Sequence, residues 1–220
     1  SRGIPFRIIA AGGVVSRKSP GSALCVAAKS NIRTAQDLQG QTVAVIALKT
    51  TAEFALREWL TQNHADASKV KIVEMPFPQM GPSLGRGTVA AAVLSEPALS
   101  AALARGEVKA IAVPTDAVAP QYMVSVWFST DRFIQTHADA VKKFVATIYG
   151  TARWANAHQD ESGAILAKYA KIDPAVLKNM TRVIYRDSLQ VSDIKPVLDL
   201  TYKYGAIDRP IAAADLLVQR

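Results

Sequence analysis

Residues 41–60 read QTVAVIALKTTAEFALREWL and join two different periodic patterns. Thr42–Ala47 is an apolar, β-branched run, which is typical of a buried strand. Over Thr51–Asn63, apolar residues recur at helical spacing, at Phe54, Ala55, Trp59 and Leu60. This stretch therefore predicts a strand, a short turn and a helix, which is the first half of a βαβ unit.

The same alternation continues downstream. We expect strands at Val70–Glu74, Val89–Leu94 and Val108–Val113, a weak helix at Gln79–Arg86, and an alanine-rich helix at Pro97–Arg105 with Pro97 in its first turn. Short apolar strands that alternate with helices predict a parallel sheet covered on both faces. We assign residues 28–115 to one complete α/β lobe.

The rest of the chain predicts a second lobe that is incomplete. Strands are expected at Ile4–Ala10, Ser22–Lys29 and Tyr122–Phe128, whereas the chain beyond Asp131 is almost wholly helical. Because these helices need a sheet beneath them, we expect N-terminal strands that precede residue 1. Residues 1–27 and 116–220 are then two pieces of this lobe. Two crossings, near Ala27 and Pro114–Gln121, would form the hinge.

Composition narrows the function classes. The 220 residues carry a net charge of +8, and the excess lies in residues 1–115, without a basic run or interleaved aromatic residues. Such scattered charge fits a solvated basic surface or a preference for anionic ligands, and it does not favour nucleic-acid binding. Uncharged runs such as Ala117–Thr130 are too short to span a membrane. Cys25 is the sole cysteine, so no intrachain disulfide is possible.

Four segments resemble a known family. They are DLQGQTVAV (37–45), VKIVEMPFPQMGPSLGRG (70–87), VLSEPALSAAL (93–103) and YKYGAIDRPIAAADLL (202–217). In this order they resemble the periplasmic substrate-binding proteins of bacterial ABC importers, of the nitrate/sulfonate/taurine group related to the pyrimidine-precursor-binding proteins. Two features depart from the pattern: GTVAAAVL lacks an expected aspartate, and Gly81 and Gly85 replace helix formers.

The resemblance implies a type II periplasmic-binding-protein fold, with two parallel-sheet lobes joined by a two-strand hinge. It also implies capture of a small anion, such as a sulfonate, nitrate, carboxylate or aromatic acid, for an ABC permease in the inner membrane. The expected protein is a monomer in the periplasm or lipid-anchored outside the cytoplasm, with no enzyme activity, cofactor, metal or nucleic-acid partner. Relatives carry additional chain upstream, including an export signal, so this chain is expected to lack an N-terminal portion.

The turn after the first strand of the complete lobe is the first candidate site. Thr50 and Glu53 form an S/T-x-x-E capping box, with Thr50 as N-cap. Alternatively, the first-turn N–H groups, the hydroxyls of Thr50 and Thr51, and the charge of Lys49 bind an anion. The two interpretations differ in whether Glu53 occupies the positive helix end itself.

Further candidates follow other strands. Glu96 either contacts the ligand or caps the helix after Pro97, and Phe77 with Pro78 either covers the ligand or forms a structural turn. On the other lobe, glycines permit a close backbone approach, and a tyrosine in VIYRDS is placed to reach the cleft. These residues are Gly12, Gly13 and Tyr185.

Competing functions have less support. The three histidines lie far apart in sequence, share no metal-ligand spacing, and accompany no nucleotide or hydrolase motif. This speaks against an enzyme of the thiamin-pyrimidine synthase type. The ligand-sensing effector domain of a LysR-type transcription regulator has a similar two-lobe fold and stays the alternative. Trp59, Trp127 and Trp154 are expected in the core or between the lobes.

Overall fold

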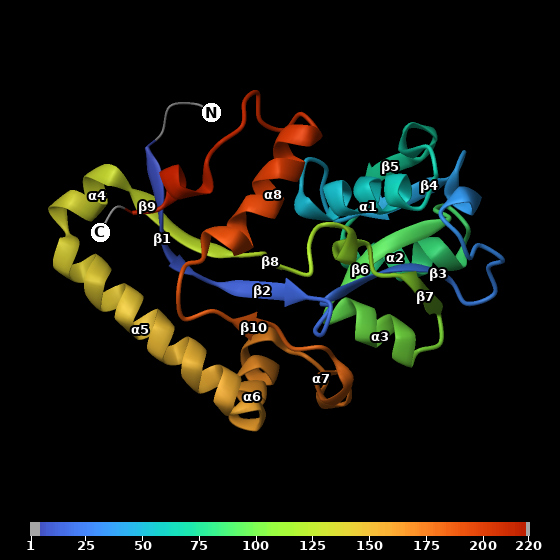
Figure 1. Ribbon diagram of the computed structural model, residues 1–220. Coiled ribbons are helices and arrows are strands. Elements are labelled where there is room, and N and C mark those ends of the chain that lie inside the picture. Colours follow the sequence, from blue (N-terminus) through green and yellow to red (C-terminus); the bar gives the residue numbers. More distant parts are fainter. Residues whose placement is uncertain (1–4, 219–220) are drawn as a thin grey trace.

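The computed structural model describes residues 5–218, which form two lobes with separate β-sheets (Figure 1). One lobe has a five-stranded sheet in the order β5-β4-β6-β3-β7. Its strands are β3 (Ser22–Ala27), β4 (Thr42–Val45), β5 (Lys71–Glu74), β6 (Ala91–Ser95) and β7 (Val108–Ala112). Its helices are α1 (Thr51–Gln62), α2 (Phe77–Gly85) and α3 (Ala98–Ala104), with 3-10 turns at Gln36–Leu38, Ala67–Lys69 and Pro114–Ala117.

The sheet of this lobe is mixed rather than wholly parallel. β4 pairs in parallel with β5 and β6, as the alternation predicts. β3 runs antiparallel between β6 and β7, which corrects the prediction of a parallel sheet. β3 also lies before residue 28, so the sheet takes in residues upstream of the expected boundary. The chain enters this lobe from the other one along β3. This strand therefore runs opposite to the other four strands of the sheet.

Both faces of the five-stranded sheet are buried, which explains its continuous apolar strands. Alternate residues of β3 and β4 point to opposite faces. One core contains Leu24, Val43 and Leu56, beneath α1, and the other contains Ala23, Ala44 and Met80, beneath α2 and α3. The helices on both faces thus make this lobe a closed unit.

The other lobe has two small antiparallel sheets. β1 (Phe6–Ala11) pairs with β9 (Val126–Thr130), and β2 (Gly13–Ser16) lies between β8 (Gln121–Met123) and β10 (Ile184–Tyr185). The single strand predicted at Tyr122–Phe128 is therefore two strands, because the chain breaks at Val124 and Ser125. The parallel sheet expected for this lobe is also corrected, since every described strand pair in it is antiparallel.

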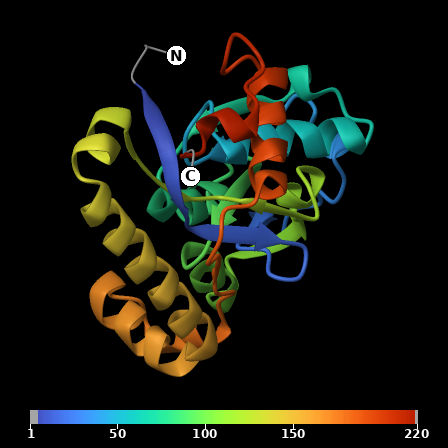
Figure 2. The same cartoon turned by 60° about the vertical axis from the view of Figure 1, so that its left-hand side comes forward.

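Helices make up most of the second lobe. They are α4 (Asp131–Thr136), α5 (Ala138–Ala157), α6 (Gln159–Ala170), α7 (Pro174–Asn179) and α8 (Val191–Lys203), with a 3-10 turn at Ala213–Leu216. In both views α5 and α6 lie at the edge of the molecule, far from the five-stranded sheet (Figure 2). The buried core is small and centres on Ala11, Val14, Met123, Ile194 and Ala213. Among residues 5–218, no helix combines the length and apolarity needed to cross a bilayer.

Two crossings connect the lobes, one between β2 and β3 and one between β7 and β8. Beside them, Glu58 of α1 accepts hydrogen bonds from Lys203 Nζ at 2.5 Å and from the Tyr204 hydroxyl at 2.8 Å, both just at the end of α8. Phe54 stacks on the Tyr204 ring with centroids 5.7 Å apart. Glu58 and Phe54 of one lobe therefore bind Lys203 and Tyr204 of the other through charge and aromatic packing.

We expect Glu58→Gln to lower the free energy of unfolding by about 1–2 kcal/mol, because hydrogen bonds to an ionised acceptor are stronger. Desolvation opposes ionisation, yet the hydrogen bonds from Lys203, Tyr204 and Gln62 prevail and lower the pKa of Glu58 below 4.5. The stabilisation is present above that value and is lost as the pH falls through the folded pKa.

Urea unfolding at pH 7 and at an acidic pH below the folded pKa of Glu58 measures this effect. The wild type and Glu58→Gln should differ at pH 7 and converge at the acidic value. Asp199→Asn is the matched control, because Asp199 pairs with Lys195 at the exposed surface of α8, where we expect about 0.5 kcal/mol or less. An equal loss at both pH values would show that the charge of Glu58 contributes nothing.

Candidate functional site

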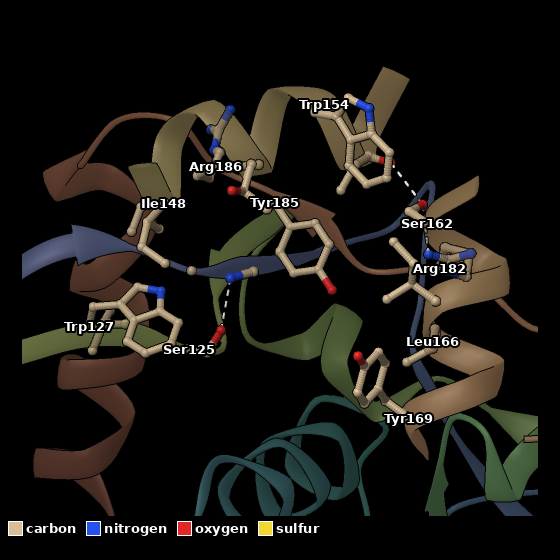
Figure 3. Close-up of a pocket in the computed structure, with 18 residues that line it drawn as sticks. Ser125, Trp127, Ile148, Trp154, Ser162, Leu166, Tyr169, Arg182, Tyr185 and Arg186 are labelled. Carbon is tan, nitrogen blue, oxygen red and sulfur yellow. Dashed lines mark hydrogen bonds between the residues drawn. The ribbon is translucent and has the colours of Figure 1, made fainter. Parts of the chain in front are cut away.

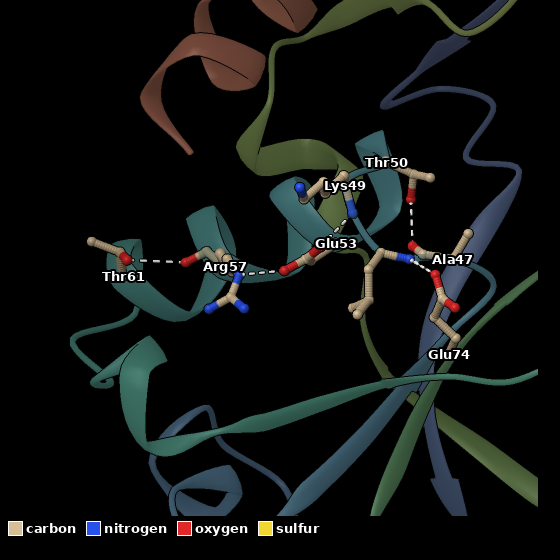
Figure 4. Close-up of polar contacts among 8 residues, drawn as sticks. Ala47, Lys49, Thr50, Glu53, Arg57, Thr61 and Glu74 are labelled. Atoms are coloured by element: carbon tan, nitrogen blue, oxygen red, sulfur yellow. Dashed lines mark hydrogen bonds and ion pairs between the residues drawn. The ribbon is translucent and has the colours of Figure 1, made fainter. Parts of the chain in front are cut away.

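The turn between β4 and α1 is organised by two carboxylates (Figure 4). Glu53 Oε2 accepts from the Lys49 N–H at 2.7 Å, and Glu74 Oε1 accepts from the Leu48 N–H at 2.7 Å. Lys49 has a φ of 57°, in the left-handed region, which is an uncommon conformation for a residue other than glycine. The two carboxylates thus take up the backbone N–H groups of Leu48 and Lys49, just before the helix.

The predicted capping box is only partly present. Thr50 is the N-cap residue, as expected, but its hydroxyl donates to Ala47 O at 2.8 Å and caps no helical N–H. Glu53 reaches one residue further back than the box requires, to Lys49, and also accepts from Arg57 Nε at 2.8 Å. The left-handed turn at Lys49 brings that N–H, rather than the N–H of Thr50, to the carboxylate.

An anion could still reach this helix start. Within residues 5–218, the N–H groups of Thr50, Thr51 and Ala52 donate to no acceptor, as is usual in the first turn of a helix. Glu53 is 7% exposed and is paired with Arg57, so its charge is partly balanced. The turn therefore combines free donors with a resident carboxylate, and the two sequence interpretations are both compatible with it.

Glu96 links the lobes. Its Oε1 accepts from the Thr181 N–H of the other lobe at 3.2 Å and from the Ser100 hydroxyl at 2.9 Å. Its Oε2 accepts from the Ser100 N–H at 3.1 Å. The carboxylate thus serves the first turn of α3, while Pro97 is the residue before that helix rather than its first residue. Glu96 is also a contact that any opening of the lobes must break.

Phe77 and Pro78 occupy the start of α2, which begins at Phe77 rather than at Gln79 as predicted. Phe77 is half-buried and packs against the core beneath α2 and α3, whereas Pro78 is exposed. These contacts support the structural-turn interpretation of this segment.

Gly12, Gly13 and Tyr185 line a hollow of about 670 Å³ in the second lobe (Figure 3). The backbone does approach another group closely at these glycines, and that group is Ser125 of the same chain. Gly12 N–H donates to Ser125 O at 3.0 Å, and Gly13 N–H donates to Ser125 Oγ at 2.8 Å. The main chain of Tyr185 is held by the Asn156 amide at 3.0 and 2.7 Å.

The walls of the hollow are mostly apolar and come from the second lobe alone. They include Trp127, Ile148, Trp154, Leu166 and Tyr169. Both arginines on the rim are already engaged: Arg186 pairs with Asp193 at 2.8 Å, and Arg182 donates to Ser162 Oγ at 3.2 Å.

The sequence-predicted site residues thus fall in several places. Gly12, Gly13 and Tyr185 share the hollow, whereas Lys49, Thr50 and Thr51 lie at α1. Sequence reasoning expected Trp127 and Trp154 in the core or between lobes, but they are 45% and 37% exposed at the hollow. No sequence signal shows which aromatic side chains of a helical lobe stay uncovered, because that depends on what packs against them.

Residues 5–218 contain no group of three or more His, Cys, Asp or Glu side chains placed to hold a metal ion. Cys25 is fully buried in β3, and burial raises the pKa of its thiol to about 12. The thiol is therefore protonated at neutral pH and is a poor nucleophile.

Known proteins resemble the chain in sequence pattern and in fold. The family model described as NMT1/THI5 like matches residues 1–162. No curated protein sequence matches.

Among solved structures, the periplasmic aliphatic sulphonate-binding protein SsuA from Escherichia coli is 18% identical, with a TM-score of 0.75 over 97% of this chain and 69% of that one. The ligand-binding component of an ABC-type import system from Staphylococcus aureus, with zinc bound, is 16% identical, with a TM-score of 0.80 over 99% and 73%.

The desulfurization enzyme DszB, in complex with biphenyl-2-sulfinic acid, is 14% identical, with a TM-score of 0.73 over 97% and 77%. At these identities the likeness shows a shared fold, which confirms the predicted two-lobe α/β architecture with one lobe incomplete in this chain.

Proposed function

Because this chain belongs to the NMT1/THI5-like family, we propose that it is a solute-binding protein, which captures a small anion between its lobes for an ABC permease. One observation carries the proposal: two lobes with separate sheets are joined by two crossings, and they also meet at Glu96 and at Glu58 with the Phe54–Tyr204 ring pair. That construction suits a hinged clamp, in which a ligand bound between the lobes favours the closed form. On this proposal the protein is periplasmic, or anchored outside the cytoplasm, and works as a monomer.

The ligand class follows from the helix start and the charge. We propose that the N–H groups and hydroxyls of Thr50 and Thr51, with Lys49 beside them, bind the acid group, because a helix N-terminus favours an anion. The net charge of +8 attracts such ligands. Two proteins of the same fold bind an aliphatic sulphonate and an aromatic sulfinic acid. A sulfonate or sulfinate with an organic body is therefore the ligand class that we propose.

Capture rather than catalysis is part of the proposal, although an enzyme shares the fold. The buried, protonated thiol of Cys25 supports it, because cysteine chemistry needs an accessible thiolate.

A thermal-shift panel tests the function. We expect alkanesulfonates or biphenyl-2-sulfinic acid to raise the melting temperature, with a shift that grows with ligand concentration over the dissociation constant. Nitrate and benzoate complete the panel. A folded protein that responds to none of these anions would contradict the proposed ligand class.

With the best sulfonate of that panel, replacing both Thr50 and Thr51 with alanine should weaken binding about 10- to 100-fold, the equivalent of about 1.5–3 kcal/mol for hydrogen bonds to a charged group. Isothermal titration calorimetry measures the change. Thr61→Ala is the matched control on α1, because Thr61 lies in the last turn of that helix, where its hydroxyl donates to Arg57 O. Equal affinities of the double variant and wild type would show that the two hydroxyls do not bind the acid group.

A further inference from the structure

β9 has one open edge. Among residues 5–218, β1 is the only strand paired with it. The far side of β1 is closed by a bridge from Ile8 to Leu217 and by the Val218 N–H, which donates to Ile8 O at 3.1 Å. An unpaired edge presents a row of backbone donors and acceptors, and a two-stranded sheet alone is marginally stable. The edge of β9 is therefore the place where this sheet can be extended.

Both faces of the β1–β9 sheet carry uncovered aromatic rings. On one face Phe6 meets Phe128 edge-on, with ring centroids 5.1 Å apart, and Phe128 is 60% exposed. On the other face Trp127 meets Phe144 of α5 in the same way at 5.3 Å. Large contiguous apolar patches are unusual on the solvent-exposed surface of a folded protein.

The hollow lined by Trp127 and Trp154 continues the uncovered surface from the sheet to α5 and α6 (Figure 3). Its lining includes no residue from the complete lobe, so it does not lie between the lobes. A ligand bound there would contact one lobe only, so its binding would not favour closure of the two lobes.

The greater length of the matched structures indicates which segment covers this surface. Three matched structures align with 97–99% of this chain but only with 69–77% of their own. The shared fold therefore includes chain that these 220 residues do not supply, while the five-stranded sheet of the other lobe is already covered on both faces.

We propose that the open edge of β9 and the adjoining hollow seat a β-strand, with a flanking amphipathic helix on each face of the sheet, from the remaining part of this protein's own second lobe. The strand pairs with β9, one helix covers Phe128, and the other fills the hollow at Trp127 and Trp154. The hollow is thus a folding interface and not the solute site. This inference is independent of the ligand proposed above.

Hydrogen exchange provides the direct test. The 220-residue chain is compared with the complete protein as its natural coding sequence specifies it. In the 220-residue chain, the outward amides of Val126–Thr130 should exchange rapidly, and the dye ANS should bind. In the complete protein these amides should be protected and ANS fluorescence should fall. Equal exchange and equal ANS binding in both proteins would overturn the inference.

A pair of variants separates this interface from a general loss of stability. Phe128→Lys should lower the melting temperature of the complete protein by several degrees and that of the 220-residue chain hardly at all, since Phe128 is exposed there. Leu103→Lys, on α3 of the complete lobe and 40% exposed, should leave both unchanged. If Phe128→Lys acts equally on both proteins, the interface is not at β9.

Two further outcomes also contradict the inference. If the 220-residue chain forms dimers in which the amides of β9 are protected, the occupant is a second copy. If a sulfonate protects the hollow in the complete protein, the hollow is a ligand site. A sulfonate that stabilises the protein while the hollow stays covered supports both proposals. If no sulfonate binds, the proposed solute-binding function is contradicted and the inference about β9 is not.

Discussion

Replacing Gly12 with alanine is expected to destabilise the protein by about 1–3 kcal/mol, the usual cost of forcing an extra methyl group into a packed site. A Cβ at Gly12 would lie 2.6 Å from Ser125 O and 2.9 Å from Ser125 C, which are main-chain atoms that cannot rotate away. The Gly12 N–H also donates to that same carbonyl at 3.0 Å, so any shift loses a hydrogen bond. Gly12 therefore joins the start of β2 to the segment between β8 and β9.

Urea unfolding of Gly12→Ala measures this cost. Gly150→Ala is the matched control, because a Cβ there meets no atom within 4 Å and the residue lies inside α5. That change should stabilise the protein by about 0.5–1 kcal/mol through the better helix propensity of alanine. If both alanine variants behave alike, the contact with Ser125 does not restrict position 12.

The second large effect is expected at Glu53. Glu53→Ala should lower the free energy of unfolding by about 2–3 kcal/mol, because it leaves the Lys49 N–H without its acceptor and Arg57 without its partner. Glu53→Gln keeps an acceptor oxygen of the same reach and should cost about half as much. Chemical denaturation of the two variants separates the hydrogen bond from the charge.

The same variants bear on the proposed anion site. Glu53 places a negative charge at the positive end of α1, where it competes with a bound anion. Removing it should therefore tighten binding of a sulfonate while stability falls. Weaker binding in Glu53→Gln, without a change in fold by circular dichroism, would show that Glu53 orients the site instead of competing with the ligand.

Much of the complete lobe could be predicted from sequence. β4, β5 and β7 lie within the apolar runs expected to form them, and β6 extends one residue beyond its run, to Ser95. Burial on both faces leaves a continuous apolar signal. The second lobe was harder. The break at Val124 and Ser125 carries no local punctuation such as glycine or proline, so two strands were predicted as one.

The candidate site could also be predicted from the sequence only in part. The position of Thr50 as N-cap follows from the local pattern, but the acceptor role of Glu53 toward Lys49 depends on a left-handed turn that a lysine rarely adopts. The cross-lobe contact of Glu96 with Thr181 joins residues 85 positions apart. A contact at that separation leaves no periodic trace in the sequence.

By itself, the sequence determined the place of most strands and helices, and it predicts one closed lobe and a second lobe whose helices need further strands. These are statements about local periodicity and total apolar surface, which are encoded within short windows. Only the tertiary structure decided the direction of β3, the use of Gly12 to admit Ser125, and the exposure of Trp127 and Phe128 beside an open strand edge. Each of these depends on which distant segments meet, and that is settled by long-range packing rather than by local propensity.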